Sequence, residues 1–411
     1  MPKQDIAVGL DIGTTKVAIC VGRHKEGAVE IMALAKAPNS GLLRGMVSDI
    51  EETVSAISAV LEEAERISNT PITSVYIGIG GAHINSVRSK GVIAVSRADG
   101  EIAEEDVKRV IDAARAIALP PNQEIIHVIP LSYTIDGQEG IKDPIGMQGV
   151  RLEVETHVIG GSTAAIKNLT KCIEQAGLRI DGMTFPPLAT SKTLLSKKQK
   201  EIGAVLVDIG AGTTQLSIFE EGEMIHCNIL PVGSMHISHD IGIGLRISPE
   251  AAEKIKLKYA TALSKHVKED EQINLANFDP NEKEKVSKKY IAEIVDARLD
   301  EIFSMIRNEL KKIGKDGTLP AGVIFTGGGA KLEGLIEYSK ENLRLPAQIG
   351  YPIMEISGMV DKLDDPVYTT SVGLMLMGLE ESSFKKTSTF NVPHLDGVSD
   401  KIKSFFKNFM P

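Results

Sequence analysis

Two distant stretches of the chain repeat one pattern of hydrophobic and polar positions. In each, an apolar run ends in Asp-Ile-Gly, a short turn rich in Gly and Thr follows, and a second apolar run leads away. The stretches are Ile6–Val21 and Ala204–Phe219. Short apolar runs bounded by turn residues are typical of buried strands, so each stretch predicts a strand, a tight turn and a returning strand. We expect a third strand after each, over Val29–Lys36 and Met224–Pro231.

A second pair of similar segments supports the first. Val75–Ala82 and Val323–Ala330 are both apolar runs that end in a cluster of glycines, and they occur in the same order as the first pair. Apolar residues at helical spacing precede them, over Ile50–Ile67 and Lys283–Ile313. Two pairs in the same order predict an α/β protein made of two related halves.

Two segments interrupt this doubling. Residues 83–161 have a mixed pattern, which is long enough for a small inserted domain. Its predicted elements are strands at Gly91–Ser96, Glu124–Ile135 and Val150–Ile159 and a helix at Ala103–Leu119. The second interruption, Ser248–Asn281, is highly charged, and we expect it to form a helical lobe.

Residues 380–411 differ in composition from the rest of the chain. Residues 380–397 are polar and predict a linker, and residues 398–411 predict a short amphipathic helix. Its apolar positions are Val398, Ile402, Phe405, Phe406, Phe409 and Met410, and Lys401, Lys403 and Lys407 lie between them. An apolar face with lysines is typical of a helix that lies on an anionic membrane surface. The alternative is a helix that docks on its own protein.

Composition places the chain among soluble globular proteins. It has 411 residues, 42% hydrophobic and 25% charged, which suggests about two to three domains. The net charge of −9 argues against nucleic acid as a partner. Three widely separated cysteines favour a reducing compartment over a disulfide framework. No apolar run is long enough to span a membrane, and the first strand pattern begins too early for a signal peptide.

The two Asp-Ile-Gly turns carry the candidate chemistry, because the P-loop, dinucleotide, zinc-protease and hydrolase-elbow motifs are all missing from the sequence. Backbone N–H groups of a tight Gly/Thr turn can surround phosphate oxygens. Lys16 adds a cation, and Asp11 and Asp208 can hold a hydrated Mg²⁺. His236 and His239 have the spacing of a metal pair without an evident third ligand, so we interpret them as ordinary histidines.

These motifs resemble those of the superfamily of actin, sugar kinases and 70-kilodalton heat-shock ATPases. Asp11–Lys16 and Asp208–Thr214 look like its two phosphate motifs, Phe325–Gly334 like its adenosine motif, and Tyr368–Leu374 like its second connecting motif. The resemblance implies bound ATP and Mg²⁺. The nucleotide-binding residues that it implies are Gly13, Thr14, Thr15, Lys16, Gly210, Ala211, Gly212, Thr213, Thr214, Gly233, Glu253, Lys256, Gly327, Gly328, Gly329 and Lys331.

Within the superfamily, the chain resembles the bacterial cell-division actin homologues of the FtsA family. Actin has an insertion between its third strand and first helix, whereas here the insertion follows Gly80 and Gly81. FtsA proteins also end in a linker and an amphipathic helix. The resemblance implies an α/β, actin-like duplicated ribonuclease-H-type fold, with two halves around a nucleotide cleft, an inserted small α/β subdomain and a C-terminal amphipathic helix.

The same resemblance implies the boundaries of the domains. They are 1–82 with 162–200 for the first half, 83–161 for the inserted subdomain, 201–232 with 313–357 for the second half, 233–312 for a helical lobe over the nucleotide, 358–379 for a return to the first half, 380–397 for the linker and 398–411 for the membrane-targeting helix.

The resemblance also implies partners and a location. They are the C-terminal peptide of the tubulin-like division protein FtsZ, filaments of the chain itself, later division proteins bound through residues 83–161, and the cytoplasmic face of the cell membrane at the division site. For the FtsZ peptide we expect a docking surface at Lys254–Asn281 with Lys288 and Lys289, because an acidic peptide favours lysines.

One position departs from the superfamily pattern. Pro186 lies in Phe185–Thr190, where related ATPases often carry a polar or acidic residue. A proline side chain can neither orient water nor bind Mg²⁺, so we expect hydrolysis to be slow at most. An actin-like ATPase of pilus assembly is the alternative within the fold. A small-molecule kinase is another alternative, although we identify no general base for it, and a chaperone would need a further domain after the second half.

Overall fold

The computed structural model describes residues 6–387, apart from residues 26, 117–119, 280–281, 283 and 355. Its first half is built on a mixed six-stranded sheet in the order β11-β6-β1-β2-β3-β19. The strands are β1 (Ile6–Ile12), β2 (Lys16–Lys25), β3 (Ala28–Pro38), β6 (Ser74–Gly78), β11 (Arg179–Thr184) and β19 (Ile356–Gly358). β1, β2 and β3 are antiparallel neighbours, whereas β6 and β11 join them in parallel.

The second half repeats this arrangement. Its sheet has the order β14-β13-β12-β17-β18, with three antiparallel strands followed by two parallel ones. The strands are β12 (Ala204–Ile209), β13 (Thr214–Glu220), β14 (Glu223–Leu230), β17 (Gly322–Thr326) and β18 (Ala347–Ile349). Read from the other edge, this is the order of the first sheet from β11 to β3. The doubling predicted from the sequence is therefore present strand by strand.

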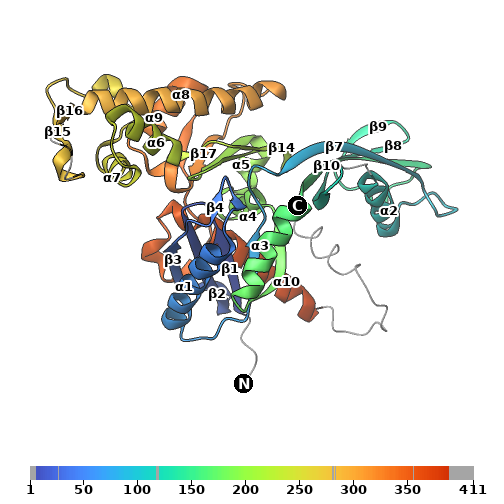
Figure 1. Ribbon diagram of the computed structural model, residues 1–411. Helices are drawn as coiled ribbons and strands as arrows, with labels where there is room; N and C mark the ends of the chain where they lie inside the picture. The colour runs from blue at the N-terminus through green and yellow to red at the C-terminus, as the bar shows by residue number, and fades with distance from the viewer. Residues whose placement is uncertain are drawn as a thin grey trace.

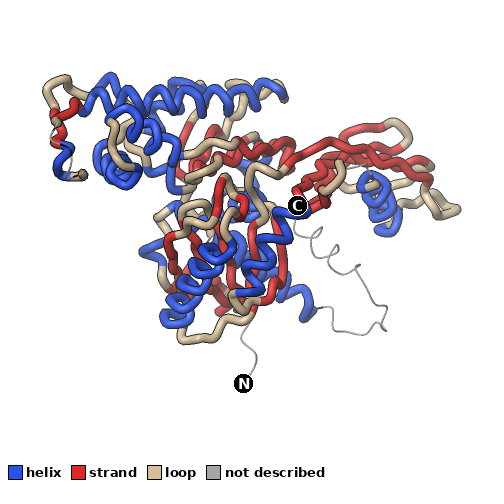
Figure 2. The backbone as a smooth tube through the Cα atoms, in the orientation of Figure 1, coloured by secondary structure: helices blue, strands red, loops and turns tan. Residues whose placement is uncertain are grey.

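Helices cover both faces of both sheets (Figures 1 and 2). On the first sheet, α1 (Ile50–Ser68) and α3 (Thr163–Gln175) bury apolar residues on one face, and α10 (Thr369–Thr387) buries residues on the other. On the second sheet, α8 (Lys288–Lys312) and α9 (Leu335–Leu343) pack on one face and α4 (Pro186–Leu194) on the other. Because α4 also packs against α10, these two helices join the halves.

The inserted segment forms a layer of its own beside the second half, at the right of Figure 1. Its antiparallel sheet has the order β7-β10-β8-β9, and α2 (Glu104–Arg115) covers one face. The strands are β7 (Asn85–Ala94), β8 (Gln123–Ile135), β9 (Gln138–Ile141) and β10 (Arg151–Ser162). Gly91 lets α2 lie close, because an added β-carbon would lie 2.0 Å from the carbonyl oxygen of Val110.

The charged lobe differs from our expectation. α6 (Ser234–Leu245) precedes the stretch Ser248–Asn281 that we expected to be helical. Within the described part of that stretch, α7 (Pro249–Tyr259) is followed by loops, two 3-10 turns and a short strand. These elements are η1 (Ser264–His266), β15 (Gln272–Asn274) and η2 (Leu275–Asn277). The long helix begins at Lys288, not at residue 283, because β16 (Lys285–Ser287) pairs with β15, which places the half-buried Val286 opposite Ile273.

The predicted linker also begins later than we expected. α10 continues to Thr387, so residues 380–387 are helical. Glu380 forms an ion pair with Lys192 of α4, and the hydroxyl of Ser382 donates to the carbonyl oxygen of Gly378 (2.8 Å), which fastens this part of the helix. The remaining linker residues and the predicted amphipathic helix, residues 388–411, lie outside the described residues. Within the described part of the chain, no helix is both long and apolar enough to cross a bilayer.

The remaining short elements connect these layers. They are β4 (Leu42–Leu43), β5 (Met46–Val47), α5 (Lys197–Ile202), η3 (Gly328–Lys331), η4 (Val360–Lys362) and η5 (Pro366–Tyr368). Cys20, Cys172 and Cys227 are buried free thiols.

Candidate nucleotide-binding site

The two Asp-Ile-Gly turns have the same backbone geometry. In the first, the amide of Gly13 donates to the carbonyl oxygen of Lys16 (2.9 Å), and in the second, the amide of Gly210 donates to the carbonyl oxygen of Thr213 (2.9 Å). Each turn therefore closes over two residues and leaves their N–H groups free of the strand ladder. Such a concavity of amides suits phosphate oxygens.

The turns face each other across the junction of the halves. A β-carbon added to Gly212 would lie 2.7 Å from Oγ1 of Thr14, so the second turn approaches the first only because this residue is glycine. Thr15 is exposed, whereas the hydroxyl of Thr214 donates to the carbonyl oxygen of Val232 (2.8 Å) and so holds the second turn rather than facing a ligand.

The residues that precede and close these turns bring three charges together. Burial, together with the charge of Asp208, raises the pKa of Asp11 from 3.8 to about 6. Burial raises the pKa of Asp208 as well, against the opposing effects of Lys16 and a hydrogen bond to Thr370, while burial lowers the pKa of Lys16. Two carboxylates that share one partly desolvated lysine carry negative charge that the protein leaves partly uncompensated.

This charge fits a divalent cation. A Mg²⁺ ion held by Asp11 and Asp208 through its waters would compensate the charge that raises both pKa values. No group of three or more His, Cys, Asp or Glu side chains suited to a metal occurs among the described residues. Two carboxylates therefore need phosphate oxygens and water to complete the coordination, which is the usual situation for Mg²⁺ bound with a nucleotide.

The glycine cluster of the second half, Gly327–Gly329, packs against the two phosphate turns. Gly327 has φ of +83°, and a β-carbon added to it would lie 2.1 Å from Oδ1 of Asp208. The position of a β-carbon on Gly328 lies 3.7 Å from Nζ of Lys16, and that on Gly329 lies 2.3 Å from the side chain of Ile209. The predicted adenosine turn thus contacts both predicted phosphate motifs.

Gly233 connects the helical lobe to the second turn. An added β-carbon would lie 2.6 Å from the carbonyl oxygens of Gly210 and Ala211, and the amides of Ser234 and Met235 donate to these oxygens (2.9 Å each). The first residues of α6 are therefore fastened to the phosphate turn.

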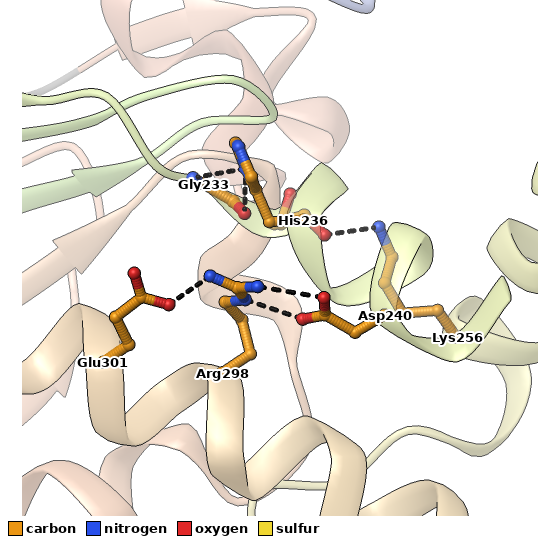
Figure 3. Close-up of polar contacts among 7 residues, drawn as sticks. Gly233, His236, Asp240, Lys256, Arg298 and Glu301 are labelled. Atoms are coloured by element: carbon orange, nitrogen blue, oxygen red, sulfur yellow. Dashed lines mark hydrogen bonds and ion pairs between the residues drawn. The ribbon is translucent and has the colours of Figure 1, made fainter. Parts of the chain in front are cut away.

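Side chains hold α6 in this place (Figure 3). Lys256 of α7 donates to the carbonyl oxygen of Ser234 (3.2 Å) and pairs with Glu253 (2.7 Å), and Arg298 of α8 forms a two-pronged ion pair with Asp240 of α6 and a further pair with Glu301. His236 accepts a hydrogen bond at Nδ1 from the amide of Gly233 (3.1 Å), and His239 is exposed.

Lys331 has a partner within the protein. Its Nζ lies 3.3 Å from Oδ1 of Asp365, whose other oxygen lies 3.5 Å from Nζ of Lys36 in the first half. Burial opposes the charge of Asp365, but the amide of Val367, then Lys331 and then Lys36 hold its pKa below the usual range. Asp365 therefore connects β3 of one half with η3 of the other beneath the adenosine turn.

Two residues at the site are additions to the sequence-based prediction. Asn39 holds the first turn: its Nδ2 donates to the carbonyl oxygen of Gly13 (2.7 Å), and its amide donates to that of Thr15 (3.0 Å). Gln215 lies opposite Asp208 in the β12–β13 hairpin, and its Oε1 is buried without a hydrogen-bond partner among the described residues.

Gln215 also lies near Pro186. A β-carbon added to Gly80 would lie 3.7 Å from Nε2 of Gln215 and 3.3 Å from Cγ of Pro186. A carboxamide thus reaches the neighbourhood in which Pro186 supplies no polar group.

Comparison with known proteins identifies the family. A family model described as "Cell division protein FtsA" matches residues 205–373, and one described as "SHS2 domain inserted in FTSA" matches residues 81–160. The chain is 38% identical over 377 residues to the Cell division protein FtsA of Pseudomonas aeruginosa, covering 92% of this chain and 90% of that protein. The chain belongs to the FtsA family. The FtsA of Bacillus subtilis is 36% identical over 375 residues, 91% of this chain and 84% of that protein.

Solved structures agree on the fold. The PilM–PilN type IV pilus biogenesis complex matches with a TM-score of 0.67 at 18% identity, over 92% of this chain and 100% of that chain. An MreB of Spiroplasma citri bound to AMPPNP matches with a TM-score of 0.56 at 14% identity, over 94% of this chain and 98% of that chain. At these identities the likeness shows the actin-like fold alone, so it gives no support to the pilus-assembly alternative against the FtsA family.

Proposed function

We propose that this FtsA-family protein binds Mg²⁺-ATP between its two halves. The observation that carries the proposal is the pair of matching turns, each with a carboxylate at the end of the preceding strand and with Lys16 between them. The adenosine would lie at Gly327–Gly329, with Gly233, Glu253, Lys256 and Lys331 around it. Bound Mg²⁺ would compensate the charge of the phosphates, and the amides of the turns would hold the phosphate oxygens.

The bound nucleotide would act mainly as a clamp. Both halves contribute to the site, and a ligand that contacts both halves favours the conformation in which they are closed. Pro186 removes a polar group from the site, so hydrolysis should be slow, and the closed conformation would persist long enough to favour filaments of the chain.

Membership of the FtsA family suggests the cellular role of this closed conformation. We propose a peripheral protein at the cytoplasmic face of the membrane, at the division site, where filaments tether the FtsZ ring. The anchor would be residues 398–411, with Ile402, Phe405, Phe406 and Phe409 in the acyl boundary and Lys401, Lys403 and Lys407 near anionic headgroups. Residues 83–161 would receive later division proteins.

The FtsZ peptide would dock where α8 begins. Lys288 pairs with Glu271 (3.2 Å) and Lys289 with Glu269 (2.7 Å), and both glutamates are largely exposed. Ion pairs at the surface contribute little to stability, so a peptide carboxylate can replace the glutamates at little cost. Tyr290 is 44% exposed beside these lysines, and it offers an apolar contact that a charged surface alone would lack.

The test is recruitment of FtsZ to vesicles that contain anionic lipids, measured by flotation with Mg²⁺-ATP. The full chain should float and carry FtsZ with it, whereas a chain that ends at residue 397 should leave both in the soluble fraction. The double variant Lys288→Glu, Lys289→Glu should float without FtsZ.

A matched control is available on α5. Lys197 and Lys198 are likewise adjacent lysines at the start of a helix, and both are exposed. Lys197→Glu, Lys198→Glu should float and still carry FtsZ. Recruitment of FtsZ that is unchanged by the α8 variant would remove this docking surface, and recruitment by the shortened chain would contradict the proposed anchor.

A further inference from the structure

The hairpin β4–β5 brings an arginine to the junction of the halves. Leu42 pairs with Val47 and Leu43 with Met46, so a two-residue turn, Arg44–Gly45, joins the strands. This hairpin rises from the first half toward the second in Figure 1.

The backbone of the hairpin packs against the second phosphate turn and against Gly81 and Ala82. A β-carbon added to Gly212, in the second phosphate turn, would lie 3.3 Å from Cα of Arg44. A β-carbon added to Gly45 would lie 2.5 Å from Cα of Gly81, and the amide of Ala82 donates to the carbonyl oxygen of Arg44 (3.0 Å). Glycines at these contacts allow the hairpin to lie this close, so the position of Arg44 is determined by the surrounding backbone.

Arg44 is an unusual residue for its conformation. Its φ is +51° and that of Gly45 is +76°, as in a type I′ hairpin turn, where Asn-Gly is strongly preferred. A bulky residue with positive φ carries a conformational cost, and such residues persist mainly where the surrounding structure or function requires them. The Arg44 side chain is exposed, and no hydrogen bond or ion pair is recorded for its guanidinium within the described part of the chain.

We propose that Arg44 binds the terminal phosphate of the nucleoside triphosphate and so distinguishes it from the diphosphate. The inference rests on the proposed nucleotide site. Arg44 lies beside Gly212, whereas the adenosine turn lies beside Asp208 and Lys16. The hairpin therefore contacts the second phosphate turn at a different point from the adenosine turn. We place this point at the end of the nucleotide site that is farther from the adenosine. A guanidinium matches phosphate oxygens with two parallel N–H donors, and it retains its charge at any physiological pH. A bound triphosphate would also hold the hairpin against Gly81 and Ala82, directly before the inserted subdomain.

The experiment compares nucleotide affinities of the full chain by calorimetry with Mg²⁺-ADP and with Mg²⁺-AMPPNP, an analogue with a non-hydrolysed terminal phosphate. Arg44→Asn introduces the residue that type I′ turns prefer, so the variant should fold as well as the parent protein. Its affinity for AMPPNP should fall about tenfold, which corresponds to about 1.4 kcal/mol, and its affinity for ADP should change less than about twofold. Arg44→Lys should lie between the two, because it keeps the charge without the fork.

Arg344 supplies the matched control, since it is an exposed arginine with φ of +54° at the end of α9. Arg344→Asn removes the same charge from the same backbone conformation and should leave both affinities unchanged. An unchanged ratio of AMPPNP to ADP affinity in Arg44→Asn would refute the inference, whether neither affinity falls or both fall by the same factor. A parent protein that binds neither nucleotide would refute the proposed function, and the inference with it.

Discussion

Replacing Asp11 by asparagine should stabilise the protein while weakening its function. In the absence of Mg²⁺ and nucleotide, the pKa of Asp11 is raised from 3.8 to about 6, chiefly by burial and then by Asp208. Each pKa unit corresponds to about 1.4 kcal/mol, so ionised Asp11 costs the folded protein up to about 3 kcal/mol near pH 7. Asp11 is partly exposed, and asparagine gives up the attraction to Lys16, so we expect a gain of about 1–3 kcal/mol.

The pH dependence follows from the direction of the shift. The folded protein binds more protons than the unfolded chain between about pH 4 and pH 6, so the unfolding free energy of the parent protein falls as the pH rises through this window. Asp11→Asn lacks this titration. Its advantage should be absent below about pH 4, grow between pH 4 and pH 6, and stay constant above.

The assay is urea unfolding at a series of pH values with a chelator present. Asp270→Asn, at an exposed position, is the control and should show no gain. In a second arm, calorimetry should show weaker Mg²⁺-dependent ATP binding by Asp11→Asn, because one carboxylate that faces the hydrated ion is lost. The reasoning is wrong if the variant is no more stable than the parent at pH 7, or if its advantage persists unchanged at pH 4.

Three further outcomes follow from the same account. Asp208→Ala should weaken ATP binding in Mg²⁺ more than in chelator, as isothermal titration would show, and equal losses would exclude a role near the ion. Phosphate release by the purified protein should be well below the usual enzyme median of about 10 per second, and rapid release would contradict slow hydrolysis. Gln215→Ala should lower the rate further, and an unchanged rate would exclude a role of Gln215 in hydrolysis. Phe406→Glu should abolish flotation with vesicles, whereas Ser404→Glu, which adds the same charge at a polar position, should still float.

The sequence predicted the doubled fold because that fold repeats its own signal. Two Asp-Ile-Gly turns and two glycine clusters in the same order required two similar sheets, and the strand orders agree. The boundaries of the helices and strands in the charged lobe were harder to predict from the sequence. Val286 fits the helical period of the long helix, yet it lies in β16, because it pairs with Ile273 in a two-stranded sheet that no local pattern reveals. The end of α10 was missed because the ion pair from Lys192 to Glu380 joins residues far apart in the chain.

The sequence was enough to predict the turns of the site, but not most of the residues that hold these turns in place. Gln215 could have been found: a two-residue turn places it opposite Asp208, and cross-strand partners point to the same face. Asn39 and Arg44 could not, because their roles depend on contacts with Gly13 and Gly212 that only the tertiary structure brings about. Lys331 was assigned to the nucleotide from its motif, whereas its pairing with Asp365 depends on the return of the chain to the first half.

Hydrogen exchange with and without Mg²⁺-ATP tests the central claim, that nucleotide binds between the two halves, most directly. Three segments that are far apart in the sequence meet at one place in the structure: Gly13–Lys16, Gly210–Thr214 and Gly327–Gly329. The account predicts that saturating Mg²⁺-ATP slows exchange in all three segments together, and that Asp208→Ala at the same nucleotide concentration loses the effect in all three. Protection confined to one half, or exchange in these segments that nucleotide leaves unchanged, would contradict it.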